Sequence, residues 1–237
     1  MSKFLHLYNS AATFEADYNG EAYKEPWVSY TREIPRVDYN KPDPANGHCY
    51  VDLGLPSGTL WACTNIGAEN PEDLGDDYAW GETEPYVEGE TYKFGSYPFT
   101  KYNSTDGKDT LDLEDDAARV QMGGEWHMPT LEQCYELMDN TTREVFDDYV
   151  VFTSNINGNQ ITIPFCGNAQ LIWLNRCSVD PNWHHTNAWM LVYGCEGSYT
   201  AYIGNETDRN DDYNQYVSRY QVRGVLGDGP EREDLDV

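Results

Sequence analysis

The amino-acid sequence predicts a domain of the α+β class, and three features carry this prediction. One segment, residues 131–140, has the pattern of a helix. Short segments of alternating polarity follow residue 145, and residues 50–83 form a long stretch rich in glycine, proline and tryptophan. One strong helix, several short strands and long ordered loops are typical of an α+β domain rather than of a helical bundle or a parallel sheet.

The helix prediction depends on its first turn. Thr130 stands just before the segment and Gln133 follows three residues later, which is the sequence of a capping box. Apolar side chains then recur on one stripe at helical spacing: Leu131, Cys134, Tyr135, Leu137 and Met138. A second, short helix is expected over residues 113–121, because acidic residues crowd its N-terminal end and Gly123 and Gly124 stop it.

Strands are expected wherever the polarity alternates between Asn- and Gly-rich turns. The candidates are residues 150–154, 160–165, 188–194, 198–204 and 220–226.

Residues 50–83 contain five glycines, two prolines and two tryptophans in 34 residues, with almost no helical periodicity. Glycine serves positions that need positive φ and proline those that need a fixed φ. We therefore expect an ordered loop system that packs its own side chains. Trp61, Trp80 and, further along, Trp126 are predicted to be buried in the core.

These residues also resemble a known family. The pattern VDLGLPSGTLWA…NIGA…PED.GD.YAWGET in residues 51–83 is similar to a C-type-lectin-like domain common in gut Bacteroidetes and their phages. Residues 111–137, 158–167 and 220–226 resemble later segments of that family in the same order, and the last is its closing strand. The resemblance covers residues 48–227 and implies a C-type-lectin-like fold whose late region presents a ligand-facing surface.

The chain departs from the family pattern at three places. His127 stands where arginine is usual, Gly224 replaces the closing proline, and residues 188–191 read AWML instead of YWSS. The last departure changes the surface chemistry expected near that strand.

Three regions are predicted along the chain: an N-terminal attachment segment at 1–45, the lectin-like domain at 48–227, and an acidic tail at 228–237. Residues 42–47 are interpreted as a linker. The stretch from residue 25 to 40 resembles the openings of virion-associated proteins of Bacteroides phages, so we expect contacts with another chain or the particle through Trp27, Val28 and Tyr30. The alternative is an edge hairpin packed on the main domain.

Charge and composition exclude several classes of protein. With 41 acidic and 15 basic residues the net charge is −26, which argues against nucleic acid or an anionic membrane as partner. No stretch has the apolar length of a membrane span, and the N-terminus lacks the apolar core of a secretory signal. The six cysteines form no CxxC pair, so we expect them mostly reduced and buried, without zinc.

Enzymatic motifs are missing from the sequence. It contains no GxSxG elbow, no phosphate-binding glycine loop and no HExxH. His184 and His185 are interpreted as hydrogen-bonding surface rather than an acid–base pair. The chain is therefore expected not to be an enzyme and to need no cofactor.

Aromatic residues among Asn, Asp and Gly in residues 170–220 point instead to binding, because such rings offer contact area at small entropic cost. The predicted ligand contacts are Trp173, Trp183, His184, Tyr193, Tyr213 and Tyr216. The alternative, that strand aromatics fill the core, applies to Trp189, Tyr199 and Tyr202. A calcium site in residues 204–212 is a further alternative to a solvated acidic loop.

The sequence thus predicts a phage virion surface protein, of head-fibre or tail-tip type, that displays a lectin-like domain for adhesion to a host-surface glycan or protein. Such appendages are usually symmetric, so a homo-oligomer is expected, with a trimer favoured, held by other virion proteins through the N-terminal segment. The expected location is the virion. The alternative is a bacterial cell-surface or secreted binding domain of the same family.

Overall fold

A computed structural model describes residues 45–96, 99–165, 170–177, 179, 187–193, 201–208, 210–211 and 216–231. The chain divides into two units between Lys41 and Pro42, and only the second is described below. The predicted attachment contacts Trp27, Val28 and Tyr30 lie outside the described residues, so they stay predictions.

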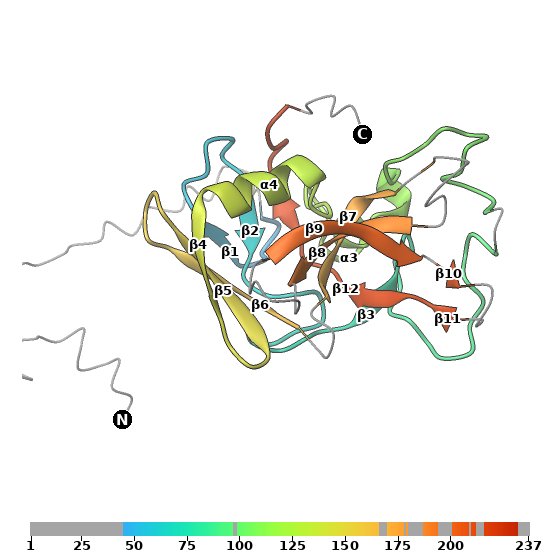
Figure 1. Cartoon of the computed structure of the whole chain (residues 1–237), viewed down its shortest axis with the longest axis horizontal. Coiled ribbons are helices and arrows are strands. Elements are labelled where there is room, and N and C mark those ends of the chain that lie inside the picture. The colour runs from blue at the N-terminus through green and yellow to red at the C-terminus, as the bar shows by residue number, and fades with distance from the viewer. Residues whose placement is uncertain are drawn as a thin grey trace, which may run out of the picture. The chain divides into compact units, whose positions relative to one another are not determined.

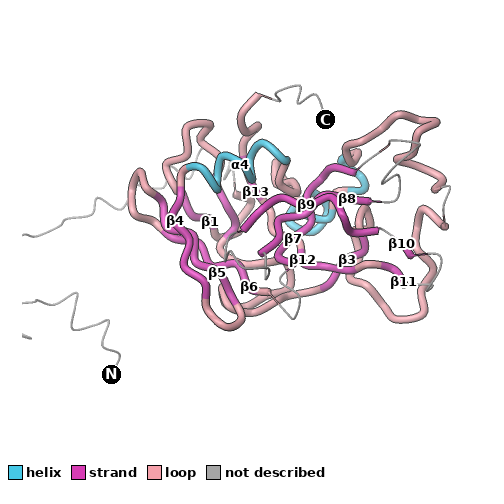
Figure 2. Tube along the Cα trace, in the orientation of Figure 1, coloured by secondary structure: helices cyan, strands magenta, loops and turns pink. Residues whose placement is uncertain are grey.

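The described part of the chain is a mixed α+β domain, as the sequence predicts (Figure 1). It has two α-helices, one 3-10 helix and thirteen short strands, and every strand pairing within it is antiparallel. Long loops join these elements, above all after residue 79 and before residue 113 (Figure 2). No helix among the described residues is long and apolar enough to cross a membrane.

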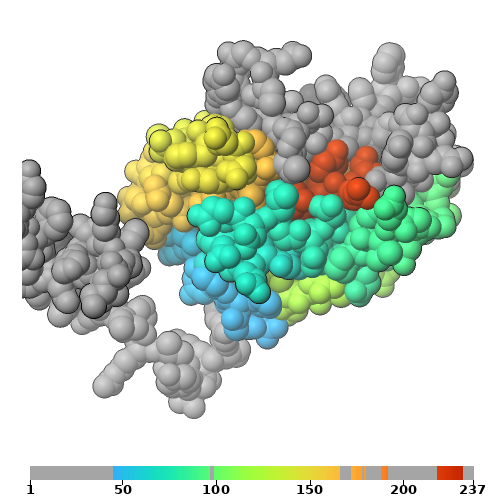
Figure 3. All heavy atoms as spheres, turned by 90° about the horizontal axis from the view of Figure 1, so that it is seen from below, coloured from blue at the N-terminus to red at the C-terminus, as the bar shows by residue number. Residues whose placement is uncertain are grey.

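Strands from the two ends of the domain lie side by side. One sheet has the order β1-β2-β13 and another pairs β12 with β3. The bounds are β1 Tyr50–Asp52, β2 Leu60–Ala62, β3 Asp77–Ala79, β12 Arg219–Gln221 and β13 Val225–Leu226. The predicted strand at 220–226 is therefore two strands, which close the domain against its N-terminal part (Figure 3, red beside teal).

The helix α4, Leu131–Asp139, begins with the predicted capping box. The Thr130 side chain accepts a hydrogen bond from the Gln133 backbone N–H at 3.1 Å, and Gln133 accepts one from Thr130 N–H at 3.0 Å. The predicted helix at 113–121 is instead a 3-10 helix, η1 Leu113–Asp115, followed by α3, Ala117–Met122. Asp116 separates them because its side chain caps α3 by accepting from Arg119 N–H.

Two antiparallel meanders form the rest of the domain. The first is β4 Thr141–Val145, β5 Tyr149–Ser154 and β6 Gln160–Pro164, and the second is β7 Gln170–Cys177, β8 Asn187–Tyr193 and β9 Ala201–Asp208. Strands β10, Asn210–Asp211, and β11, Tyr216–Val217, pair to form a two-stranded antiparallel ribbon. The strands expected at 150–154, 160–165 and 188–194 correspond to β5, β6 and β8, and the described part of the one expected at 198–204 lies in β9.

Two clusters of buried side chains make the core. One contains Trp80 and Trp126, and the other packs Trp61 with Leu137 and Phe152. All three tryptophans have 0% of their surface exposed, so the prediction that they are buried is confirmed.

Trp173 is also completely buried, and the prediction that it contacts a ligand is wrong. Its indole N–H donates to the Tyr78 carbonyl at 2.9 Å, and its ring packs edge-on against Tyr220. The reason is that β7 lies beside β12, so the ring fills the space between them. Trp189 is half-buried and packs against the second core cluster, which agrees with the alternative of a core role.

The cysteines differ in part from the expectation. Cys134 and Cys177 are buried thiols, as predicted. Cys49 and Cys63 instead form a disulfide, because the antiparallel register of β1 and β2 brings them opposite each other. Cys166 lies outside the described residues, as does Cys195.

The domain begins before residue 48. Ala45 is buried, and its carbonyl accepts the indole N–H of Trp126 at 2.8 Å. The Asn46 amide donates to the Met122 carbonyl, also at 2.8 Å. Residues 45–47 therefore belong to the folded domain rather than to a linker.

The candidate calcium segment also differs from the expectation. Its first part, up to Asp208, belongs to β9 and pairs with β8, while Asn210 and Asp211 form β10. The backbone there is strand, whereas a calcium site of the expected kind needs a loop that curls its oxygen ligands around one ion.

Candidate functional site

An open groove follows the helix α4. It consists of two adjoining hollows of about 380 and 460 Å³, which share Glu132, Pro230 and Glu231 as a common wall. The first hollow reaches across to Thr110 and β7, and the second runs along α4 toward its C-terminal end. We call these two hollows together the α4 groove.

The floor of the first hollow is the end of β7. The backbone of Asn175 is fixed on both sides, since its carbonyl accepts from Leu111 N–H at 2.9 Å and its N–H donates to the Pro129 carbonyl at 3.0 Å. Its side-chain amide is half-buried and has no hydrogen-bond partner among the described residues. An amide held in this way offers both a donor and an acceptor to a ligand.

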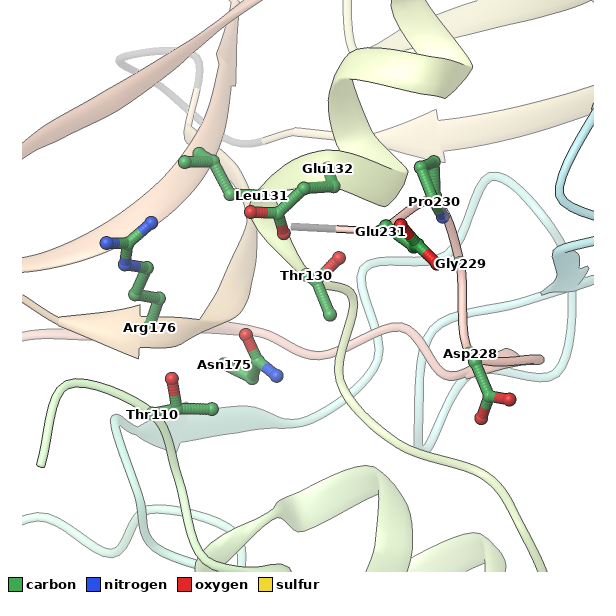
Figure 4. A pocket seen from close by; sticks show the side chains of 10 residues that line it. All are labelled: Thr110, Thr130, Leu131, Glu132, Asn175, Arg176, Asp228, Gly229, Pro230 and Glu231. Carbon is green, nitrogen blue, oxygen red and sulfur yellow. The ribbon is translucent and has the colours of Figure 1, made fainter. Parts of the chain in front are cut away.

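Four further polar groups line the same hollow as this amide. Glu132 and Thr130 face the same hollow as Asn175, with Arg176 at one end and Glu231 at the other (Figure 4). The Nε of Arg176 pairs with Asp109 at 3.2 Å, which leaves its terminal nitrogens without a partner in the described part of the chain. The hollow therefore presents both hydrogen-bond donors and acceptors.

The wall formed by the C-terminal segment is held against α4. The Gln133 amide donates to the Gly227 carbonyl at 2.9 Å. At Gly229, with φ +74°, a Cβ would lie 2.5 Å from Gln133 Cγ, so only glycine allows this close approach. Residues 228–231, expected to be part of the acidic tail, thus form one side of the groove.

The second hollow has an aromatic surface. The Tyr135 ring is 40% exposed there, beside Asp139 and Asn140. Tyr135 belongs to the predicted apolar stripe of the helix, but its side chain is exposed. The neighbouring Glu136 is buried instead, because its carboxylate accepts from the N–H and the hydroxyl of Ser57 at 2.7 and 2.6 Å.

An acidic cluster outside the groove is the only place in the described chain where three ligand-type side chains come together. The carboxylates of Asp112, Glu114 and Asp115 lie within 4.8 Å of one another. The ammonium of Lys101 already contacts all three, at 2.7, 3.4 and 2.5 Å. The cluster is therefore an ion-pair network rather than a candidate metal centre.

Asp115 is the buried centre of this network. It pairs with Lys93 and Lys101 and accepts the hydroxyl of Tyr102 at 2.6 Å. Burial by itself raises the pKa of this carboxyl, but the hydrogen bonds from Lys101, Lys93 and Tyr102 outweigh it and hold the pKa below its usual range.

Most of the predicted ligand contacts are not tested by this structure. Trp183, His184 and Tyr213 lie outside the described residues, and Tyr193 and Tyr216 are described only as members of β8 and β11. Sequence analysis missed the groove residues. No local pattern could reveal Asn175, because its free amide results from contacts with two distant segments.

Comparison with known proteins gives no match: neither a protein-family model, nor a curated protein, nor a solved structure matches the chain. What the fold and the site define is an α+β domain of short antiparallel strands with an open, polar groove along one helix.

Proposed function

We propose that this chain is a virion surface protein, of head-fibre or tail-tip type, whose C-type-lectin-like domain binds a glycan on the host surface. The support comes from the ordered motifs in residues 48–227 and from the two closing strands, which pair with the N-terminal part of the domain as a closing strand should. The role is non-enzymatic, and the N-terminal segment attaches the domain to other virion proteins as part of a homo-oligomer.

The observation that carries this proposal is the α4 groove. Each sugar hydroxyl both donates and accepts a hydrogen bond, and Asn175 provides both partners, with the Glu132 carboxylate and Arg176 beside it. Tyr135 supplies an exposed ring on which the apolar face of a sugar stacks. The carboxylates of Glu132, Asp228 and Glu231 disfavour an anionic ligand.

A second candidate, a bacterial cell-surface or secreted binding domain, is equally compatible with the disulfide between Cys49 and Cys63. Disulfides persist in oxidising surroundings, which include secreted proteins and virion surfaces alike. The disulfide therefore supports an extracellular location under both candidates. The two candidates differ in the role of the N-terminal segment, which attaches the domain to other virion proteins only under the first.

The groove can be tested with a panel of neutral trisaccharides, titrated into the full-length protein and followed by calorimetry. Asn175→Ala and Tyr135→Ala should each weaken binding about tenfold, since each removes an interaction worth about 1.4 kcal/mol. Neither variant should change the midpoint of urea unfolding much, because the side chain of Asn175 has no hydrogen-bond partner among the described residues and Tyr135 is exposed.

The matched control is Phe146→Ala, since Phe146 is an equally exposed ring (40%) outside the groove. It should leave trisaccharide binding unchanged. A Trp183→Ala, Tyr213→Ala double variant tests the predicted contacts outside the described residues. If only this double variant loses binding, recognition takes place in that region and not in the α4 groove.

The attachment role predicts a different phenotype for a truncated chain. Deleting residues 1–41 leaves Ala45, which Trp126 needs as a hydrogen-bond acceptor, and should give a folded domain that binds sugar normally. That domain should fail to incorporate into particles, as measured by immunoblot of purified virions. Incorporation at the level of the full chain would exclude attachment through this segment.

A further inference from the structure

The described part of the chain contains one disulfide, and it lies where the chain enters the domain. Cys49 directly precedes β1 and Cys63 directly follows β2, with their Cα atoms 5.4 Å apart. β1 is a three-residue strand at the edge of the β1-β2-β13 sheet. The disulfide therefore links the start of β1 to the end of β2, the central strand of that sheet.

Other contacts hold the same segment without using either sulfur. Trp126 binds the Ala45 carbonyl and meets the ring of His48 edge-on, with the ring centres 6.1 Å apart. Beyond β1, Leu53 and Leu55 are buried in the second core cluster. Breaking the bond should therefore loosen β1 locally while the rest of the domain stays folded.

The bond is open to solvent. Cys49 is exposed, Cys63 is half-buried, and Cys49 lines a hollow of about 170 Å³ beside His48 and Thr64. By contrast, the thiols of Cys134 and Cys177 belong to residues with 0% and 1% of their surface exposed. A small thiol can reach the disulfide in the folded protein but not these two thiols.

We infer that Cys49–Cys63 is a thiol-exchange site that sets how firmly strand β1 is held against β2. The thiolate of a small thiol attacks Cys49 Sγ, the S–S bond breaks, and Cys63 leaves as a thiolate that takes up a proton from water. A second small thiolate then attacks the mixed disulfide and releases Cys49, which is protonated in turn. Two small thiols are oxidised to their disulfide, and the protein disulfide gains the two electrons.

The consequence is that β1 is held in two ways. In a reducing cell interior the Cys49–Cys63 disulfide is reduced and β1 is held by its hydrogen bonds and packing alone, whereas outside the cell the disulfide forms again. For a displayed domain, this means that β1 is held more loosely during assembly and more firmly on the finished particle. That timing rests on the proposed function, but exchange at the disulfide itself does not.

The test uses the full chain under native conditions with reduced glutathione, followed by alkylation and peptide mass spectrometry. Cys49 and Cys63 should become reactive while Cys134 and Cys177 stay unlabelled, and the glutathione adduct trapped by early quenching should be on Cys49. Hydrogen exchange of the β1 amides should quicken at least about tenfold on reduction, with those of β5 unchanged.

A Cys49→Ser, Cys63→Ser double variant should show the same fast β1 exchange without any reductant. The inference is overturned if the bond survives glutathione until denaturant is added, or if Cys134 and Cys177 become labelled at the same rate, because reduction would then require global unfolding. An adduct on Cys63 would contradict the direction of attack. None of these readouts depends on particles or on sugar binding.

Discussion

Replacing Trp80 or Trp126 with alanine is expected to lower the free energy of unfolding by about 4 kcal/mol, the usual cost of emptying a buried tryptophan site. Both side chains have no exposed surface, and both indole N–H groups are used: Trp80 donates to the Leu174 carbonyl and Trp126 to the Ala45 carbonyl, each at 2.8 Å. The measurement is urea unfolding followed by far-ultraviolet circular dichroism.

Phenylalanine replacements separate packing from hydrogen bonding. The indole N–H of Trp61 is buried without a partner in the described structure. Trp80→Phe should therefore cost about 1 kcal/mol more than Trp61→Phe, because only the former leaves a buried carbonyl, that of Leu174, without its donor. Equal costs for the two replacements would contradict the assigned role of the Trp80 hydrogen bond.

The second large effect is expected at Asp115, where Asp115→Asn should destabilise the protein at pH 7 by about 2 kcal/mol, since it removes the buried carboxylate that accepts from two lysine ammonium groups and from the Tyr102 hydroxyl. Because the folded-state pKa of Asp115 lies below the unfolded value, the stabilisation is present above the unfolded pKa of about 4. It is lost as the pH falls through the lowered folded pKa.

The stability difference between wild type and Asp115→Asn should therefore shrink as urea unfolding is repeated at successively lower pH. Glu114→Gln serves as the control, because Glu114 belongs to the same cluster but its side chain is 80% exposed, and it should cause no measurable change. A pH-independent difference for Asp115→Asn would mean that its destabilisation has another cause than the lost charge.

Features that depend on a few neighbouring residues could be predicted from the sequence. The capping box of Thr130 and Gln133 uses atoms three residues apart, so local sequence is sufficient to specify it. The burial of Trp61, Trp80 and Trp126 follows from their size and apolar character, which leave few other places for them.

Features that depend on contacts between distant segments could not be predicted from the sequence. Trp173 lies in residues 170–220, whose aromatic and polar composition predicted a ligand-binding surface, but β7 packs beside β12 and buries Trp173. Tyr135 is exposed although it belongs to the apolar stripe of α4. The next residue, Glu136, is buried in its place, because Ser57, which is distant in sequence, donates hydrogen bonds to its carboxylate. Which face of a short helix is buried depends on what packs against it.

By itself, the sequence determined the fold class, the cap of α4 and the buried tryptophans, because each depends on local propensity or on the hydrophobicity of single residues. Only the tertiary structure decided that Cys49 meets Cys63, that the amide of Asn175 is left free, and that residues 228–231 wall a groove. These depend on strand register and on the packing of segments up to about a hundred residues apart, which no local pattern encodes.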